Sequence, residues 1–200
     1  MLHTFVLPPL RRLYDWVLSW AHHPYAQAAL FVLAFAESSV FPIPPDVLLI
    51  ALALGIPARA FRFALITTVG SVLGGLAGYA IGYGLMASVG QWILDFYNLH
   101  AQFERIRELY LQYDVWAVGI AGFTPIPYKV FTIAAGAFDM DLWRFALASL
   151  AGRGGRFYLV ALLIYYYGAP IRGFIDRYFG ALTLVFTALL VGFFILLAYV

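Results

Sequence analysis

Residues 37–46 read Glu-Ser-Ser-Val-Phe-Pro-Ile-Pro-Pro-Asp, an apolar stretch that is interrupted by prolines and bounded by a carboxylate at each end. A second, altered copy at residues 123–130 reads Phe-Thr-Pro-Ile-Pro-Tyr-Lys-Val, with Lys129 at the position of Asp46. Proline lacks the backbone N–H and its ring clashes with the preceding helical turn, so neither stretch can continue a helix. We therefore expect the chain to turn at these prolines: Pro42, Pro44, Pro45, Pro125 and Pro127.

The composition is that of an integral membrane protein. Hydrophobic residues make up 64% of the chain and charged residues 11%, and the mean hydropathy is +0.88. Soluble domains carry about 25% charged residues. The chain of 200 residues has no linker-like or low-complexity segment, which predicts one membrane domain.

Several function classes find no support in the residues. The chain has no cysteine and four histidines, which argues against thiol chemistry, disulfides and a metal cage, so we expect no metal and no cofactor. The net charge of +2 is too small to indicate nucleic-acid binding. No Ser-His pair lies near the acids, and we therefore expect a non-enzymatic protein.

The region 26–90 predicts one structural unit. Its apolar arms at 26–41 and 47–56 reach roughly 24 and 15 Å at 1.5 Å per residue, less than a hydrocarbon core of about 30 Å. Two short arms joined by a proline turn indicate a re-entrant hairpin, which needs protein or water around its broken backbone. Residues 63–88 then predict a transmembrane helix with a stripe of glycines for close packing: Gly70, Gly74, Gly78 and Gly82.

The same plan repeats at 115–168. Apolar arms at 115–123 and 130–138 flank the second proline turn, and residues 143–168 predict another transmembrane helix. Between the two repeats, residues 91–114 predict one amphipathic connector helix at the membrane surface. Residues 1–25 predict an interfacial amphipathic helix and residues 179–200 a final transmembrane helix.

Counting the membrane crossings gives the fold class. The arginines at positions 11, 12, 59, 62, 172 and 177 lie on one side, which the positive-inside rule makes cytoplasmic. The two hairpins then enter from opposite faces. We expect an all-α integral membrane protein of the bacterial inner membrane, built as an inverted repeat of two re-entrant hairpins that are each followed by a transmembrane helix.

Five ionisable residues fall within the apolar segments: Glu37, Asp46, Lys129, Arg153 and Arg156. A charge exposed to lipid at the bilayer centre costs about 2.5 to 3.5 kcal/mol, so these groups must face one another or water. Three cations and two carboxylates leave one positive charge, which predicts an anion, and phosphate suits paired arginines. Glycines beside Arg153 and Arg156 leave room for a ligand to approach.

The carboxylates Glu37 and Asp46 are candidate proton carriers. Protonation would release the arginines to hold an anion, and deprotonation would let the carboxylates displace it. The alternative is structural: the five groups form salt bridges that lock the hairpins to the last repeat helix.

At these residues the chain resembles the DedA family, whose members share the VTT domain of eukaryotic lipid scramblases. The resemblance covers residues 26–168 and is carried by Glu37, the first Phe-Pro-x-Pro motif and Asp46, the glycine-striped helix, and Phe123-x-Pro125. It implies two opposed re-entrant hairpins and movement of undecaprenyl phosphate or anionic phospholipid, linked to the proton motive force. The family's arginine before Phe123 is replaced by Gly122, and Lys129 stands near the second family arginine, which indicates a divergent branch.

Together these patterns predict a proton-linked flippase or scramblase, with Lys129, Arg153 and Arg156 binding the lipid phosphate and Glu37 and Asp46 carrying protons. A small-solute or ion exchanger could use the same site, and a structural membrane protein could use the same charges as salt bridges. The expected partners are membrane lipid and protons, and a homo-oligomer is compatible with the sequence.

Overall fold

The computed structural model describes residues 23–40, 44–124, 126–168 and 170. All regular structure in this part of the chain is helical. Most of the predicted interfacial helix 1–25, the predicted helix 179–200 and the turn prolines Pro42 and Pro125 lie outside the described residues.

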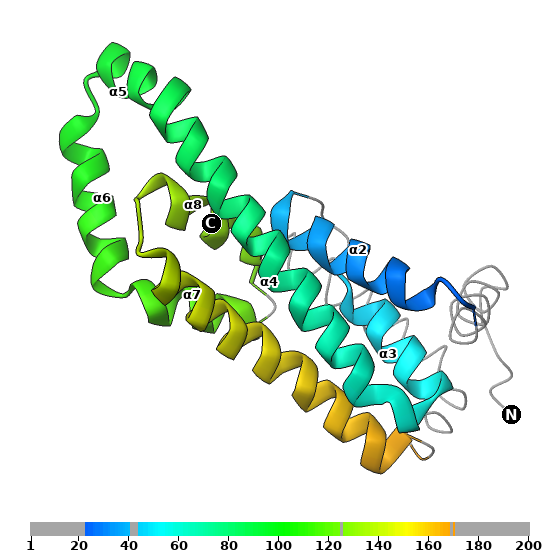
Figure 1. The fold of residues 1–200 in the computed structure, drawn as a ribbon. Helices are drawn as coiled ribbons and strands as arrows, with labels where there is room; N and C mark the ends of the chain where they lie inside the picture. The colour runs from blue at the N-terminus through cyan, green and yellow to red at the C-terminus, as the bar shows by residue number, and fades with distance from the viewer. Residues whose placement is uncertain (1–22, 41–43, 125, 169, 171–200) are drawn as a thin grey trace, which may run out of the picture.

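A long helical segment, Pro57–Tyr97, forms the axis of the molecule (Figure 1). It begins with a 3-10 turn (Pro57–Arg59), continues as α4 (Ala60–Leu85), passes through one π-helical stretch (η3, Met86–Gly90) and ends as α5 (Gln91–Tyr97). A second long helix is Leu142–Gly168, drawn in yellow to orange in Figure 1. Among the described residues, these two segments are long and apolar enough to cross a membrane.

The first Pro-Ile-Pro motif separates two short helices, α2 (Ala26–Ser39) and α3 (Asp46–Gly55). The second motif separates α7 (Asp114–Phe123) and α8 (Tyr128–Ala137). Pro45 and Pro127 directly precede the first residues of α3 and α8, where a missing N–H costs no helical hydrogen bond. Both proline stretches therefore break the helix as the sequence predicts. We call α2–α3 the first broken-helix unit and α7–α8 the second.

The helix α4 packs against both units through its glycine stripe. A Cβ at Gly74 would overlap the backbone of Phe35 in α2, and one at Gly82 would overlap the carbonyl of Ile133 in α8. Only glycine allows the backbones to approach this closely. The predicted packing role of the stripe is confirmed at these two positions.

Two apolar cores share α4 and the Leu142–Gly168 helix. The first lies under the first broken-helix unit and joins Leu49 and Phe63 to Phe157. The second lies under the second unit and joins Val118 and Ala135 to Phe145. Because the start of α4 shares its core with the end of the other long helix, the two helices run antiparallel.

The segment between the two broken-helix units differs from the single connector helix predicted at 91–114. It is divided into α5 and α6 (His100–Gln112) at Asn98, which adopts a left-handed conformation with φ of 54°. Asparagine tolerates this conformation better than most residues, so it can end α5. The Tyr110 hydroxyl of α6 donates to the Phe131 carbonyl at 2.9 Å, and burial raises the pKa of this phenol.

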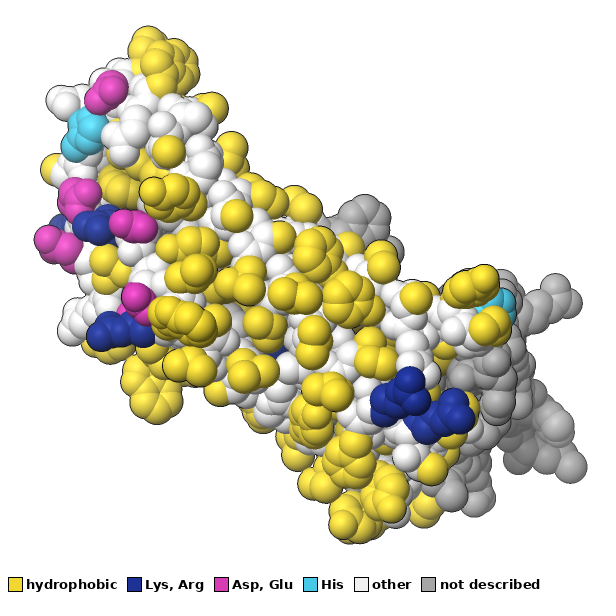
Figure 2. Space-filling view, viewed as in Figure 1, with side chains coloured by type: hydrophobic (Ala, Val, Ile, Leu, Met, Phe, Trp, Pro, Cys, Tyr) yellow, Lys and Arg dark blue, Asp and Glu magenta, His cyan; other side chains and the backbone are white. Residues whose placement is uncertain are grey.

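Exposed side chains divide the molecule into a band and two ends. Figure 2 shows hydrophobic side chains over the middle, acidic and basic groups together at the α5–α6 end, and only basic groups at the opposite end of the visible face. The basic end includes the exposed Arg59 and Arg62, whereas Asp95, Glu104 and Glu108 are exposed at the other end. A hydrophobic band between charged ends is the pattern expected of a protein in a bilayer.

Candidate functional site

A buried polar site separates the two cores. On α4 it follows Phe63 and contains the buried residues Thr67, Thr68 and Ser71. On the Leu142–Gly168 helix, Ser149 and Arg153 are buried between Phe145 of the second core and Phe157 of the first. The threonine hydroxyls donate to carbonyls one turn earlier in α4, at 2.8 and 2.7 Å, which satisfies them locally. The remaining polar groups face the broken-helix units.

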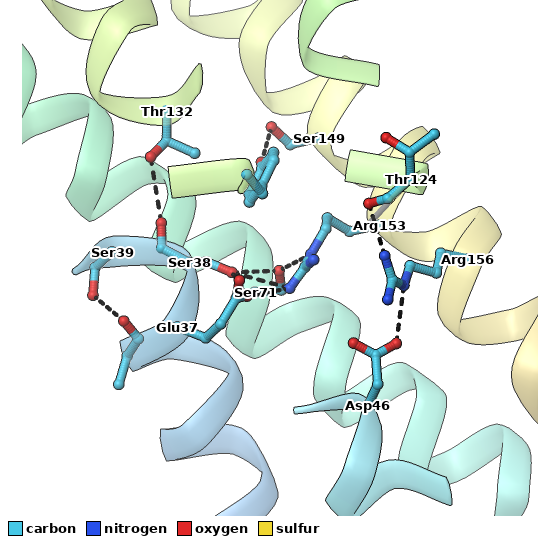
Figure 3. A network of polar contacts seen from close by, with 12 residues as sticks. Glu37, Ser38, Ser39, Asp46, Ser71, Thr124, Thr132, Ser149, Arg153 and Arg156 are labelled. Carbon is cyan, nitrogen blue, oxygen red and sulfur yellow. Dashed lines mark hydrogen bonds and ion pairs between the residues drawn. The ribbon is translucent and has the colours of Figure 1, made fainter. Parts of the chain in front are cut away.

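Arg153 is the most deeply buried charge of the site. Its side chain is 3% exposed, and its Nη2 donates to Oε2 of Glu37 at 2.5 Å. Its Nε donates to the Ser71 hydroxyl at 2.5 Å. The guanidinium carbon lies 5.0 Å from the ring centre of Tyr128 and 4.7 Å from that of Phe157, within the range of cation–π attraction. Glu37, at the end of α2, therefore pairs with a cation that is held in place by α4, α8 and its own helix (Figure 3).

Arg156, one helical turn later, forms the second ion pair. Its Nε donates to Oδ1 of Asp46 at 2.9 Å, and the two side chains are 21% and 16% exposed. Its Nη1 donates to the Thr124 carbonyl at 2.7 Å. Thr124 follows the last residue of α7, where a carbonyl has no helical partner. Arg156 thus joins the breaks of both broken-helix units.

Lys129 differs from the two arginines. It lies in the first turn of α8 and is partly buried. Among the described residues, its ammonium has no ion-pair or hydrogen-bond partner. The structure therefore places four of the five predicted residues in two ion pairs and leaves Lys129 as the unbalanced cation.

The glycines near the arginines contact protein. A Cβ at Gly152 would overlap the carbonyl of Gly119 in α7, and one at Gly154 would touch Thr68 of α4. A Cβ at Gly122 would lie 3.3 Å from the backbone nitrogen of Arg153 and 3.5 Å from its Cγ. The room that the sequence suggested for a ligand is filled by neighbouring helices at these positions. Gly122, which stands where the resemblance places an arginine, instead leaves space for Arg153.

Sequence reasoning missed the hydroxyl groups of the site. Ser38 donates to Glu37 at 3.2 Å and lies 2.7 Å from Ser71, oxygen to oxygen. Tyr128 donates to Ser149 at 2.6 Å, and Thr132 donates to the Ser38 carbonyl at 3.3 Å. Ser38 could have been suspected because it is next to Glu37. Ser71 gave no such signal, because it sits in a helix whose glycines already explain the pattern.

The turn prolines in the described residues are not equivalent. Pro44 and Pro127 are exposed and Pro45 is buried. Their rings place Asp46 in the first turn of α3 and Lys129 in the first turn of α8. A helix N-terminus favours an acid and disfavours a cation, so the first arrangement is locally favourable. The second is locally unfavourable for the Lys129 ammonium.

Comparison with known proteins identifies the family of the chain. A sequence model of the VTT domain matches residues 43–166. An uncharacterized protein of Haemophilus influenzae is 39% identical over 151 residues, which cover 76% of this chain and 78% of that protein. An uncharacterized protein of Histophilus somni is 38% identical over 156 residues, with the same coverage. No solved structure matches significantly.

Proposed function

The chain belongs to the VTT domain family, and on that basis we propose that this membrane protein of the DedA family is a proton-linked flippase or scramblase of an anionic lipid. The observation that carries the proposal is the charge arrangement of the buried site. Glu37 forms an ion pair with Arg153 and Asp46 forms one with Arg156. Lys129 has no anionic partner in the described residues. One net positive charge among apolar helices calls for an anion.

The two broken-helix units are proposed to be re-entrant hairpins of an inverted repeat. Their helices have 14, 10, 10 and 10 residues, against about 20 for a span. Broken backbone at membrane depth is tolerated where protein or water surrounds it. Arg156 supports this reading because it contacts Asp46 beyond the first break and Thr124 at the second.

A bacterial inner-membrane location follows as part of the same proposal. Arg59 and Arg62 are exposed at one end of the hydrophobic band, and acids are exposed at the other. The positive-inside rule then makes the arginine end cytoplasmic. Several crossings are proposed, two of them by the long helices.

Protonation of the carboxylates is the proposed coupling step. With Glu37 and Asp46 ionised, the arginines are occupied by internal anions. When the acids take up protons, the charge on the site rises from +1 to +3, because two negative charges are removed. An undecaprenyl phosphate or anionic phospholipid headgroup would then bind Lys129, Arg153 and Arg156, and deprotonation would displace it. No covalent chemistry is proposed.

Two alternatives remain as outcomes of the test. A small-solute or ion exchanger could use the same cations. A purely structural membrane protein is favoured by one specific observation, because each arginine already has a carboxylate partner. The transport proposal requires Lys129 to bind an anion, whereas the structural proposal does not require Lys129, because it forms no ion pair with the described residues.

The test is lipid translocation in proteoliposomes, with undecaprenyl phosphate and a fluorescent anionic phospholipid, with and without a pH gradient. We expect native protein to move at least one lipid, Arg156→Gln to abolish movement, and Arg62→Gln, an exposed arginine outside the site, to retain it. Glu37→Gln and Asp46→Asn should remove the response to the gradient. Failure of folded native protein to move either lipid would reject the lipid proposal, and competition by a soluble anion alone would favour the exchanger.

A further inference from the structure

Four side chains of the buried site form a closed ring of hydrogen bonds (Figure 3). Arg153 donates from Nε to Ser71 at 2.5 Å and from Nη2 to Glu37 at 2.5 Å. Ser38 lies 2.7 Å from Ser71 and 3.2 Å from Oε2 of Glu37. Because Ser71 accepts from Arg153, its own proton is available to Ser38, whose proton is then available to Glu37. The donor direction thus runs from the arginine through both serines to the carboxylate.

The position of Arg153 does not depend on Glu37 alone. Ser71 holds Nε, and the rings of Tyr128 and Phe157 lie beside the guanidinium. Tyr128 is itself fixed by its hydrogen bond to Ser149, and both residues are fully buried. The guanidinium consequently keeps its place when the carboxylate loses its charge. Its Nη2 then needs another acceptor.

We infer that Oε2 of Glu37 marks the position that one phosphate oxygen of the substrate occupies, with Arg153 Nη2 and the Ser38 hydroxyl as its donors. Both donors already converge on this one carboxylate oxygen, and Nη2 also lies 3.4 Å from the Ser38 hydroxyl. Glu37 acts as an internal substitute for the substrate oxyanion. Ser71 is a positioning residue that aims Arg153.

The inference rests on the proposed function for its ligand, a phosphate group. Replacement of the Glu37 carboxylate by an anion at Arg153 needs only proton uptake by Glu37. The charged and titratable groups that the structure places at this position are Arg153 of the Leu142–Gly168 helix and Tyr128 of α8. The Arg156–Asp46 pair begins one helical turn after Arg153, and Lys129 follows Tyr128 in α8. From α4 the ring receives the uncharged Ser71. The cations outnumber the acids, so a phosphate oxygen replacing the carboxylate keeps the site compensated.

The experiment compares adjacent serines in purified full-length protein in zwitterionic nanodiscs. Glu37→Gln imitates the protonated acid, and we expect it to bind inorganic phosphate at least about tenfold more tightly than native protein at a pH where Glu37 is ionised. Adding Ser38→Ala should lower that affinity about tenfold. Adding Ser39→Ala should leave it unchanged, because the Ser39 hydroxyl donates to Ala36 within its own helix at 3.0 Å.

A pH profile separates this role from a structural one. With Glu37 present, Ser38 supports the ionised carboxylate, so Ser38→Ala favours proton uptake and should move half-maximal phosphate binding to higher pH even as the maximal affinity falls. Ser71→Ala should shift the profile in the same direction. Ser39→Ala should not move it. Thermal unfolding of each variant confirms that a folded protein is measured.

The outcomes also separate the inference from the proposed function. If native protein translocates lipid but Glu37→Gln does not tighten phosphate binding, or Ser38→Ala and Ser39→Ala behave alike, the inference is overturned and the function stands. If the serine contrast appears but no lipid moves, the phosphate position is supported and the lipid function fails. Nanodiscs that contain phosphatidic acid distinguish the sources: competition with inorganic phosphate identifies a lipid headgroup ligand, and its absence a free anion.

Discussion

The first and second broken-helix units share a Pro-Ile-Pro core but supply different chemistry to the same site. The first contributes two carboxylates, Glu37 and Asp46, each paired with an arginine. The second contributes the Thr124 carbonyl, which binds Arg156, and it carries Lys129, whose ammonium has no partner among the described residues. The difference teaches that the two Pro-Ile-Pro motifs share the helix break, which is a backbone property, while the side chains beside the breaks differ.

The largest expected effect concerns a feature that the two units share, their close packing against the glycines of α4. Gly74→Ala would drive a methyl group into the backbone of Phe35, and Gly82→Ala would drive one into the Ile133 carbonyl. Backbone cannot move aside as a flexible side chain can, so each change should cost about 3 kcal/mol, the upper end of the usual cost of overpacking. Loss of the monodisperse folded protein in detergent, or a large fall in its thermal midpoint, is the expected measurement.

Gly84 provides the matched control on the same helix. A Cβ there meets nothing within 4 Å, so Gly84→Ala should be neutral or stabilise the helix by up to about 1 kcal/mol. If Gly74→Ala alone were harmful, α8 would not depend on close approach to α4 as α2 does. The common scaffold would then be limited to the first unit.

The second prediction separates the two ion pairs of the first unit. Arg153→Gln leaves Glu37 without its partner beside a side chain that was 3% exposed, and it should cost about 3 to 5 kcal/mol. Arg156→Gln should cost less, because its side chain is 21% exposed and water can reach Asp46. Chemical or thermal unfolding in detergent gives both values.

A double variant checks that charge is the cause. Glu37→Gln combined with Arg153→Gln removes the uncompensated carboxylate and should recover much of the lost stability. Equal losses for the two arginine variants would mean that the burial difference between the pairs has no energetic consequence.

The third prediction concerns Tyr128 of the second unit, whose ring lies beside the Arg153 guanidinium. Tyr128→Phe keeps the aromatic ring beside the guanidinium but removes the 2.6 Å hydrogen bond to the buried Ser149. A buried hydroxyl left without its partner costs about 1 to 3 kcal/mol. Adding Ser149→Ala to Tyr128→Phe should restore part of this stability, measured by the same unfolding experiment. Additive losses from the two changes would show that the hydroxyl contact is unimportant.

The sequence predicted the fold-forming breaks because their cause is local. Proline cannot donate its backbone nitrogen, so α2, α3, α7 and α8 end or begin where the motifs require. It also predicted that charges within the apolar segments face one another, because lipid would not tolerate them singly, and four of the five do so in two ion pairs. The break at Asn98 was missed because apolar spacing runs through α5 and α6 without interruption. A single left-handed residue leaves that spacing unchanged.

The partners within the site depended on three-dimensional register and could not be predicted. Whether Glu37 meets Arg153 or Arg156 is decided by how far α2 slides along α4 and by the antiparallel course of the Leu142–Gly168 helix. Ser71 enters the ring because one turn of α4 passes between Ser38 and Arg153. A serine within a glycine-rich helix carries no signal of that position.

Lys129 gives the smallest expected effect on stability and the sharpest contrast between the units. Because it makes no ion pair with the described residues, Lys129→Gln should change the free energy of unfolding by no more than about 0.5 kcal/mol, whereas Glu37→Gln breaks an ion pair. Translocation of the anionic lipid should nevertheless fall strongly, because the variant removes the uncompensated charge that an anion would neutralise. Unfolding and proteoliposome translocation are measured on the same preparation, with Arg62→Gln as the control for loss of one cation. Unchanged transport by a stable Lys129→Gln protein would mean that the second unit supplies no charge to the substrate, and that its role is confined to the backbone carbonyl and the apolar core.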